Sequence, residues 1–420
     1  MAIQTPKGTR DFYPEDQAVQ DYIFDKWRQA CLDFGYEAYE GPTFEHLELY
    51  TGKSGDEIIS QLYNFTSKGD VELALRPEMT PTLARLINQK GNQIRKPCKW
   101  FSIPRLFRYE KAQKGRLREF FQLNMDILGT DEITAEVDLL LAIDHLLRSF
   151  GLTDEHFVMG VSSRRLLAGL LEELEITEPT AVYAALDKRQ KVGSEKFTTL
   201  LTDAGLSPDN IEFLDKLMAS TTLTELKEYC RGEKSLAAHL ELETLFNTLS
   251  NLGVQSFKLD LNVVRGLAYY TGIVFEVFNK KQAMRAVAGG GRYDDLCQKL
   301  GGKAVTGVGF GMGDVVLKDM LEENGLATCD ELAGPDFYIV RFDKDVTQCF
   351  GLARELRSQG KSVSHNLQGQ KIQKQLENAS RLGAKYVVFM DSESSTNDQY
   401  DMKNLKTGEQ SVCALDAISI

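Results

Sequence analysis

One stretch of the chain constrains its fold more than any other: two apolar runs separated by a short charged segment. The runs are residues 99–109, KWFSIPRLFRY, and residues 120–129, FFQLNMDILG. The segment between them, residues 111–119, reads KAQKGRLRE and contains a glycine. Two apolar runs of strand length joined by a turn-forming segment predict a long β-hairpin. The charged tip of this hairpin would project from a fixed, buried base.

Polar side chains recur at alternate positions near the base of the predicted hairpin. Arg108 and Glu110 are two residues apart on one side, and Gln122, Asn124 and Asp126 follow the same spacing on the other. Alternate residues of a strand share a face, so each set is expected on one side of its strand. Polar side chains on one face of strongly apolar strands predict a lined pocket rather than a core.

The hairpin tip is basic. Four cations lie within eight residues, at Lys111, Lys114, Arg116 and Arg118. A charge run of this kind is usually a solvated surface. Here the tip is projected from a fixed base, which suits contact with a polyanion such as an RNA end.

A second constraint is the alternation of glycine with apolar residues in GVGFGMG, residues 307–313. A strand with this pattern has one face reduced to its backbone, while the other face packs into the core. Glycine inside a strand marks close approach by a ligand or by another part of the chain. Of these two readings, tight packing and a ligand surface, we favour the ligand surface. The run Gly289-Gly290-Gly291 before Arg292-Tyr293 predicts a second segment of bare main chain, either a turn or a floor under a substrate.

Two further segments carry candidate site residues. In RPEMTP, residues 76–81, a rigid turn could hold Glu78 against an ammonium group, and the alternative is a helix start capped by Thr80. In VVRGLAYYTG, residues 263–272, Arg265 is costly to bury without an anionic partner. Adjacent tyrosines on a strand face opposite ways. Counting by two from Arg265 therefore selects Tyr269, unless a bulge at Gly266 reverses the order.

The remaining pattern predicts two domains joined by a linker. Residues 1–325 would form an α+β domain with a helix near the N-terminus and a helical insertion at about 165–250. Residues 326–334, where the apolar pattern lapses, would be the linker. From 335 to 420, alternating strand and helix patterns predict a small α/β domain with a mostly parallel sheet.

Composition limits the classes of function. The net charge of −12 argues against a protein that coats nucleic acid in general, so any RNA contact would use local basic patches. The seven cysteines contain no C-x-x-C pair, which predicts neither zinc ligation nor a disulfide framework, and the histidines form no metal-binding motif. The first residues contain no apolar signal region, and no run of about 18 apolar residues exists. We therefore expect a cytoplasmic protein without a membrane span.

Taken together, these segments resemble the histidyl-tRNA synthetases, a family of class II aminoacyl-tRNA synthetases, over nearly the whole chain. The matching segments are PKGTRDFYPED, YEGPTFE, FRYEKAQKGRLREFFQ, RGLAYYTGIVFE, GGGRYDDL with VGFGMG, and, near the C-terminus, LGAKYVVFMD with KNLKTGEQ. The resemblance implies a mostly antiparallel sheet flanked by helices, in a homodimer, followed by an α/β anticodon-binding domain. It also implies histidine, ATP with accompanying Mg²⁺, and tRNA(His) as ligands.

The resemblance assigns the amino-acid site as follows. Glu78 and Thr80, with Met79 between them, would hold the α-ammonium group of histidine, and Gln122 and Arg265 would meet its carboxylate. The residues that would surround the imidazole are Tyr269, Tyr270 and Asp126, with Tyr293 as the floor.

For ATP, the resemblance makes Arg108 a bridge between the carboxylate and the α-phosphate, so that Arg108 and Arg265 are the catalytic residues. Glu110 would lie near the adenine, and Gly309 and Gly311 would approach the nucleotide. The tRNA contacts would come from the tip, at Lys111, Lys114, Arg116 and Arg118, with Arg116 facing either the ATP tail or the tRNA acceptor end.

Three positions depart from the family pattern. Ala268 replaces the usual Asp, Asp126 replaces the commoner Glu, and Val316 stands where an Arg usually meets the γ-phosphate. Arg285 and Arg116 are the candidates to replace that Arg. Two alternatives share the resemblance: a regulatory subunit of histidine biosynthesis and a sensor that binds uncharged tRNA.

Overall fold

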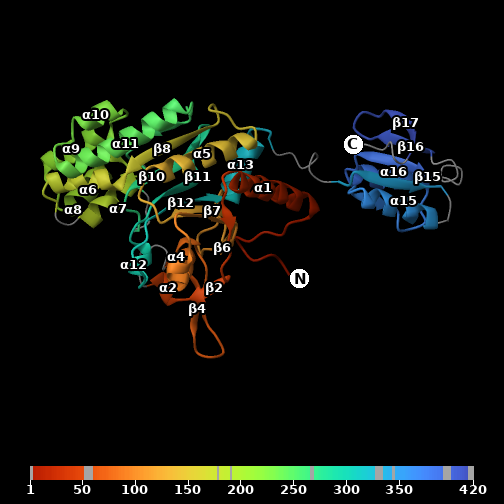
Figure 1. Cartoon of the computed structure of the whole chain (residues 1–420), viewed down its shortest axis with the longest axis horizontal. Helices are drawn as coiled ribbons and strands as arrows, with labels where there is room; N and C mark the ends of the chain where they lie inside the picture. Colours follow the sequence, from red (N-terminus) through yellow and green to blue (C-terminus); the bar gives the residue numbers. More distant parts are fainter. Residues whose placement is uncertain are drawn as a thin grey trace. The chain divides into compact units, whose positions relative to one another are not determined.

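The computed structural model describes residues 3–51, 60–176, 179–189, 192–264, 269–326, 334–342, 346–390 and 399–414. The chain divides into two compact units. The larger comprises Met1–Asp11 and Ile23–Leu326, and the smaller comprises Phe12–Tyr22 and Ala327–Ile420. Each unit has its own sheet (Figure 1).

The larger unit is built on a mixed sheet in which antiparallel pairs predominate. In spatial order its strands are β1 (Glu37–Ala38), β5 (Cys98–Ser102), β7 (Glu119–Leu128), β12 (Gly307–Gly313), β11 (Gln282–Arg292), β10 (Ile273–Asn279), β8 (Phe157–Ser163) and β9 (Phe257–Leu259). Only the outer pairs among these strands, β1 with β5 and β8 with β9, are parallel. The expected mostly antiparallel sheet is confirmed.

The predicted hairpin is present in a modified form. Strands β5 and β6 (Arg105–Phe107) both pair with β7, with a break at Ile103-Pro104 between them. The first strand ends at Phe107, so the prediction that Arg108 and Glu110 share a strand face was wrong. The Glu110 amide instead donates to the Arg108 carbonyl at 2.8 Å, because the chain turns as it enters the tip.

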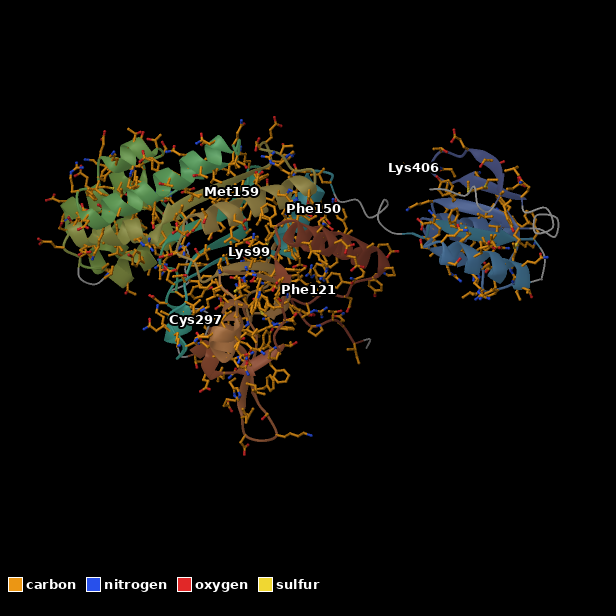
Figure 2. All side chains as sticks on the ribbon, viewed as in Figure 1. Lys99, Phe121, Phe150, Met159, Cys297 and Lys406 are labelled. Carbon is orange, nitrogen blue, oxygen red and sulfur yellow. The ribbon has the colours of Figure 1, made fainter. Side chains whose placement is uncertain are left out.

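Helices flank this sheet and bury their apolar faces. They are α1 (Pro14–Asp33), α4 (Thr80–Lys90), α5 (Thr134–Ser149), α12 (Leu296–Lys299) and α13 (Asp314–Glu323), with the 3₁₀ turn η1 (Gly91–Gln93) after α4. Trp27 of α1 is fully buried, and Phe24 of the same helix meets Phe121 of β7 with ring centroids 4.9 Å apart. Phe121 is labelled in Figure 2. Burial of large rings dominates the energetics of such contacts.

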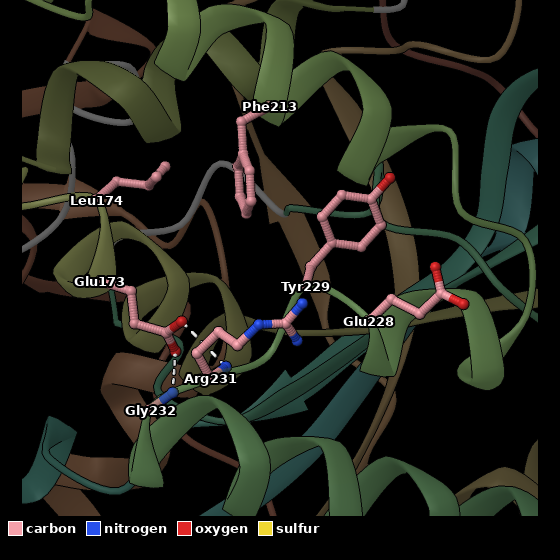
Figure 3. Close-up of a pocket in the computed structure, with 7 residues that line it drawn as sticks. All are labelled: Glu173, Leu174, Phe213, Glu228, Tyr229, Arg231 and Gly232. Atoms are coloured by element: carbon pink, nitrogen blue, oxygen red, sulfur yellow. Dashed lines mark hydrogen bonds between the residues drawn. The ribbon is translucent and has the colours of Figure 1, made fainter.

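The insertion predicted at about 165–250 is helical. It consists of α6 (Arg164–Glu173), α7 (Pro179–Lys188), α8 (Ser194–Asp203), α9 (Pro208–Met218), α10 (Leu223–Lys227) and α11 (Glu233–Asn251). Helices α6 and α11 pack closely: a Cβ added to Gly169 would lie 2.8 Å from the Ser235 amide nitrogen. The insertion contains a cavity of about 480 Å³ bordered by Phe213 and Tyr229. At its edge, the Glu173 carboxylate accepts the amides of Arg231 and Gly232, so this charge is already engaged (Figure 3).

A three-stranded sheet projects from the N-terminal half of the larger unit. Its order is β2 (Phe44–His46), β4 (Glu72–Leu75), β3 (Tyr63–Thr66), with helix α2 (Glu48–Thr51) after β2. Phe44 and Phe65 are 49% and 43% exposed, and their rings meet edge to face. This small sheet therefore presents an apolar surface.

The smaller unit has a five-stranded sheet. Its order is β14 (Val363–His365), β13 (Phe337–Arg341), β15 (Tyr386–Met390), β16 (Gln399–Asn404) and β17 (Gln410–Ala414), with helices α15 (Val346–Ser358) and α16 (Ile372–Arg381). The predicted parallel arrangement holds for β14, β13 and β15. It fails for β16 and β17, which form an antiparallel hairpin. These two strands carry mostly polar residues, so they lack the apolar run that predicts a central strand.

Candidate active site

The glycines of β12 and the polar residues of β7 lie on one face of the large sheet. Strand register places Gly309 opposite Asp126 and Gly311 opposite Asn124. A Cβ on Gly309 would lie 2.0 Å from Asp126 Oδ1, and one on Gly311 would lie 2.7 Å from Gln122 Cδ. The glycines therefore let two polar side chains of β7 lie across the sheet. The side chains of Asp126 and Gln122 lie over Gly309 and Gly311.

The glycine surface continues onto β11. Gly291 pairs with Gly309, and Gly289 pairs with Gly311, so all four share this face. A Cβ on Gly291 would lie 2.7 Å from the Ile273 carbonyl oxygen. Two neighbouring strands thus provide a floor of main chain, as the GGG run suggested.

Asp126 and Tyr293 form a buried pair above this floor. The Tyr293 hydroxyl donates to Asp126 Oδ1, and each residue is only 3% exposed. Burial raises the pKa of the Asp126 carboxyl to about 7, although the hydrogen bond from Tyr293 acts in the opposite direction. Burial, together with the negative charge of Asp126, also raises the pKa of Tyr293 well above its ordinary value.

A second carboxylate and phenol pair lies beside the first. Tyr269 donates to Glu78 Oε2 at 3.0 Å, and the Tyr269 and Tyr293 rings are perpendicular with centroids 6.0 Å apart. Burial and the charge of Glu78 raise the pKa of Tyr269, whereas a hydrogen bond with Thr80 lowers it. The result is a row, Glu78–Tyr269–Tyr293–Asp126, with a carboxylate at each end and phenols between them.

Tyr270 belongs to the same group as Tyr269. Their ring centroids are 4.9 Å apart, and both rings join one buried apolar cluster with Tyr293. The prediction that the two tyrosines lie on a strand and face opposite ways was wrong, because β10 begins only at Ile273 and both tyrosines precede it.

The turn before α4 differs from its sequence-based alternative. Helix α4 begins at Thr80 with Met79 at the N-cap position and no side-chain cap, so the capping role considered for Thr80 is not found. The Met79 side chain is fully buried and lies 4.0 Å from Arg76 Nη1. Met79 therefore supports the turn from the core side, while Glu78 and Thr80 reach Tyr269.

Arg108 joins the hairpin to the Glu78 turn. Its Nε donates to the Pro77 carbonyl oxygen at 2.9 Å, and its guanidinium lies 5.4 Å from the Phe120 ring centroid. The structure thus brings Arg108 next to the residue that precedes Glu78. A fixed guanidinium in this position can meet an anion held between the hairpin and the turn.

The hairpin tip is partly neutralised by its own contacts. Arg116 pairs with Glu110 at 2.9 Å, and Lys114 pairs with Glu323 at 3.4 Å. Lys111, Lys114 and Arg116 are exposed. The tip therefore presents three of its four predicted cations to solvent.

Arg118, the fourth tip cation, is held by the protein. Its guanidinium lies 4.2 Å from the Tyr109 ring centroid and donates to the Glu110 carbonyl oxygen, while its amide donates to the Gly8 carbonyl oxygen. A Cβ on Gly8 would lie 2.8 Å from the Arg118 side chain. These contacts give Arg118 a structural role in closing the tip against the N-terminus.

Residues 8–314 match the family model described as Histidyl-tRNA synthetase, and residues 336–419 match that described as Anticodon binding domain. The chain belongs to the histidyl-tRNA synthetase family. The histidine–tRNA ligase of Opitutus terrae is 40% identical over 417 residues, with 96% of this chain and 94% of the relative covered. The resemblance expected from the motifs is confirmed.

Solved structures of histidyl-tRNA synthetases share this fold. The enzyme from a Nostoc species gives a TM-score of 0.86 at 24% identity, with 99% of this chain and 98% of that chain covered. The apo enzyme of S. aureus gives 0.72 at 28% identity with the same coverage.

The structure does not describe every residue that departs from the family pattern or that the resemblance assigns to the site. Arg265 and Ala268 lie outside the described residues, as does the side chain of Arg285. Val316 lies in the first turn of α13 and is partly buried. Its position provides no cation.

Sequence reasoning missed Asp314. This carboxylate is fully buried, pairs with Arg10 at 2.6 Å and accepts the Phe121 amide at 3.0 Å. It therefore links the N-terminal segment, β7 and the start of α13. The available signal was an acidic residue directly after the glycine strand, in the first turn of a helix, where a negative charge is stabilised.

The pair Arg292–Glu136 was also missed. Its side chains are 5% and 1% exposed, and Arg292 Nη2 lies 2.7 Å from Glu136 Oε2. The pair fixes the end of β11, and so the residue before Tyr293, to α5. Residues 156 positions apart give no local sequence signal.

The described residues contain no group of three or more His, Cys, Asp or Glu residues placed to hold a metal ion. No helix in the described part of the chain combines the length and the apolar character that a membrane span requires.

Proposed function

We propose that this chain attaches L-histidine to tRNA(His) at the expense of ATP, through a histidyl-adenylate, and releases AMP and diphosphate. The observation that carries this proposal is the row Glu78–Tyr269–Tyr293–Asp126 on its glycine floor, in a chain of the histidyl-tRNA synthetase family. A carboxylate at each end of a short buried row suits a ligand with a cationic group at one end and an N–H donor at the other.

Histidine is such a ligand. Its α-ammonium group binds Glu78 and Thr80, and its imidazole N–H donates to Asp126 between the rings of Tyr269 and Tyr270, with Tyr293 below. Gln122 and Arg265 bind the carboxylate. A site built from buried polar groups rejects amino acids that leave those groups unpaired.

Activation follows from the placement of charge. The histidine carboxylate oxygen attacks the α-phosphorus of ATP, a new P–O bond forms, and the bond to the β-phosphate oxygen breaks with release of diphosphate. Arg108 and Arg265 stabilise the negative charge that develops on the α-phosphate, and the tip residues Glu110 and Arg116 lie toward the adenine and the phosphate tail. Mg²⁺ accompanying ATP would offset part of the charge of its phosphates.

Transfer then uses the tRNA terminus. A hydroxyl of the terminal ribose attacks the activated carbonyl, and AMP leaves with the electrons of the cleaved bond. The exposed tip residues Lys111, Lys114 and Arg116, with Arg118 at their base, contact the phosphates of the acceptor end. We assign residues 1–325 to catalysis, 326–334 to a linker and 335–420 to anticodon binding.

We further propose that the protein works as a cytoplasmic homodimer. The support is the apolar surface of Phe44 and Phe65 on the small sheet, because exposed aromatic patches mark interaction surfaces. Sedimentation equilibrium should give twice the chain mass.

ATP–pyrophosphate exchange measured with each of the twenty amino acids tests the function. Histidine alone should support exchange, and the enzyme should then charge tRNA(His). Arg265→Ala should abolish the exchange, because the attacking carboxylate loses its cation. Exchange with another amino acid would overturn the specificity. Absence of both exchange and charging would indicate the regulatory or tRNA-sensing alternative.

A further inference from the structure

Tyr39 lies next to the amino-acid site but belongs to none of the segments that define it. It follows β1, and its amide donates to the Phe101 carbonyl oxygen at 2.9 Å. Its ring lies 5.7 Å from that of Trp100, which pairs directly with Asp126 across β5 and β7. The Tyr39 ring packs against the apolar cluster that contains Tyr293.

The hydroxyl of Tyr39 is buried without a hydrogen bond to any group in the described part of the chain. Its electrostatic neighbours are Asp126, Glu40 and Arg76, and it also acts on Tyr293. Buried hydroxyl groups are normally hydrogen-bonded, so an exception beside a ligand site requires an explanation.

The two phenols of the row are already committed. Tyr293 donates its proton to Asp126, and Tyr269 donates its proton to Glu78. A neutral imidazole has one N–H donor and one bare nitrogen acceptor. Asp126 can accept from the N–H group, but a carboxylate cannot donate to the bare nitrogen. Tyr39 has an uncommitted proton in the same cluster.

We infer that Tyr39 is a specificity-determining residue whose hydroxyl donates to the imidazole nitrogen that Asp126 leaves unbound. The inference rests on the proposed function, because it takes histidine as the ligand. Tyr39 and Asp126 together read both nitrogens of the ring. A ring of similar shape without these nitrogens would leave both groups buried and unpaired, and would be rejected.

The variant Tyr39→Phe removes only the hydroxyl and tests the inference. Two constants are measured by pyrophosphate exchange: KM for histidine, and Ki for 2-thienylalanine, whose ring resembles imidazole in shape but has no nitrogen. Loss of one ligand hydrogen bond should raise KM about tenfold with kcat nearly unchanged. Ki should stay the same or fall, because the analogue no longer leaves the Tyr39 hydroxyl unpaired, so the ratio Ki/KM should fall at least tenfold.

Tyr36→Phe is the matched control. Tyr36 is a buried tyrosine in the same segment, and its hydroxyl already donates to Asp138 at 3.2 Å. This control should leave Ki/KM unchanged even if it lowers the melting temperature. An unchanged Ki/KM ratio in Tyr39→Phe would show that its hydroxyl is only structural and would overturn the inference. Exchange by the wild-type enzyme separates the two proposals: if histidine supports none, the proposed function itself has failed.

Discussion

At the scale of single residues, the burial of Asp126 acts in opposite directions on folding and on recognition. The folded chain holds the pKa of this carboxyl at about 7, against an ordinary value of 3.8, so it binds the proton more tightly than the unfolded chain does. The stability that this group contributes is present below about pH 4 and is lost as the pH rises through 7. The ionised Asp126 carboxylate is the form that accepts the imidazole N–H of bound histidine. The same ionised form lowers the stability of the folded chain when the site is empty.

Asp126→Asn should separate these two effects. Without ligand, the melting temperature of the variant should exceed that of the wild type by less at pH 5 than at pH 8, by about 2–4 °C for each kcal/mol recovered. The KM for histidine at pH 8 should rise at least tenfold, because a charged acceptor is lost. Scanning fluorimetry and exchange kinetics at both pH values measure the two effects. A variant less stable than the wild type at pH 8 would contradict this account of burial.

At the scale of secondary-structure elements, the sequence predicted the strands that carry a repeating pattern of apolar residues or glycines. Apolar runs identified the hairpin of β5, β6 and β7, and alternating glycines identified β12. Where prediction failed, the cause lay in strand ends and distant partners. Tyr269 and Tyr270 precede β10 by a few residues, which alternation cannot detect, and the buried hydroxyl of Tyr39 depends on contacts that only the assembled sheet creates.

The glycine floor gives a prediction at this scale. In Gly309→Ala the new Cβ would meet Asp126 Oδ1 at 2.0 Å and the Met125 carbonyl oxygen at 2.8 Å. The variant should lose about 1–3 kcal/mol of stability and bind histidine more weakly, because Asp126 must move.

Gly313→Ala is the control on the same strand. Nothing lies within 4 Å of its Cβ, and Gly313 has an ordinary φ of −82°. Denaturant melts and histidine KM values should therefore match those of the wild type. Equal effects of the two substitutions would rule out the steric role assigned to Gly309.

At the scale of the whole molecule, every described residue of the amino-acid site belongs to the larger unit. The alternation of strands and helices predicted the C-terminal α/β sheet as far as β15. It did not predict the polar β16–β17 hairpin, because this hairpin buries few apolar side chains. The arrangement of the larger sheet could not be read from the sequence, since β7 and β12 pair across the whole helical insertion.

A chain that ends at Leu326 should therefore keep histidine-dependent pyrophosphate exchange at a rate comparable to that of the full chain. Its kcat/KM for charging tRNA(His) should fall about 100-fold, because a second binding surface on the same chain acts through effective concentration. Parallel exchange and charging assays measure both. Loss of exchange in a truncated chain that still melts cooperatively would contradict the assignment of catalysis to the larger unit.

The contact of Arg10 with Asp314 joins residues 304 positions apart, and β7 likewise pairs with β12. During synthesis the ribosome releases β7 long before its partner strand, so one edge of this apolar strand stays unpaired while the insertion emerges. Unpaired edges invite association with other chains. The edge of β7 in the nascent protein thus stays exposed until residues 307–314 leave the ribosome. The need for chaperones should be greatest in that interval.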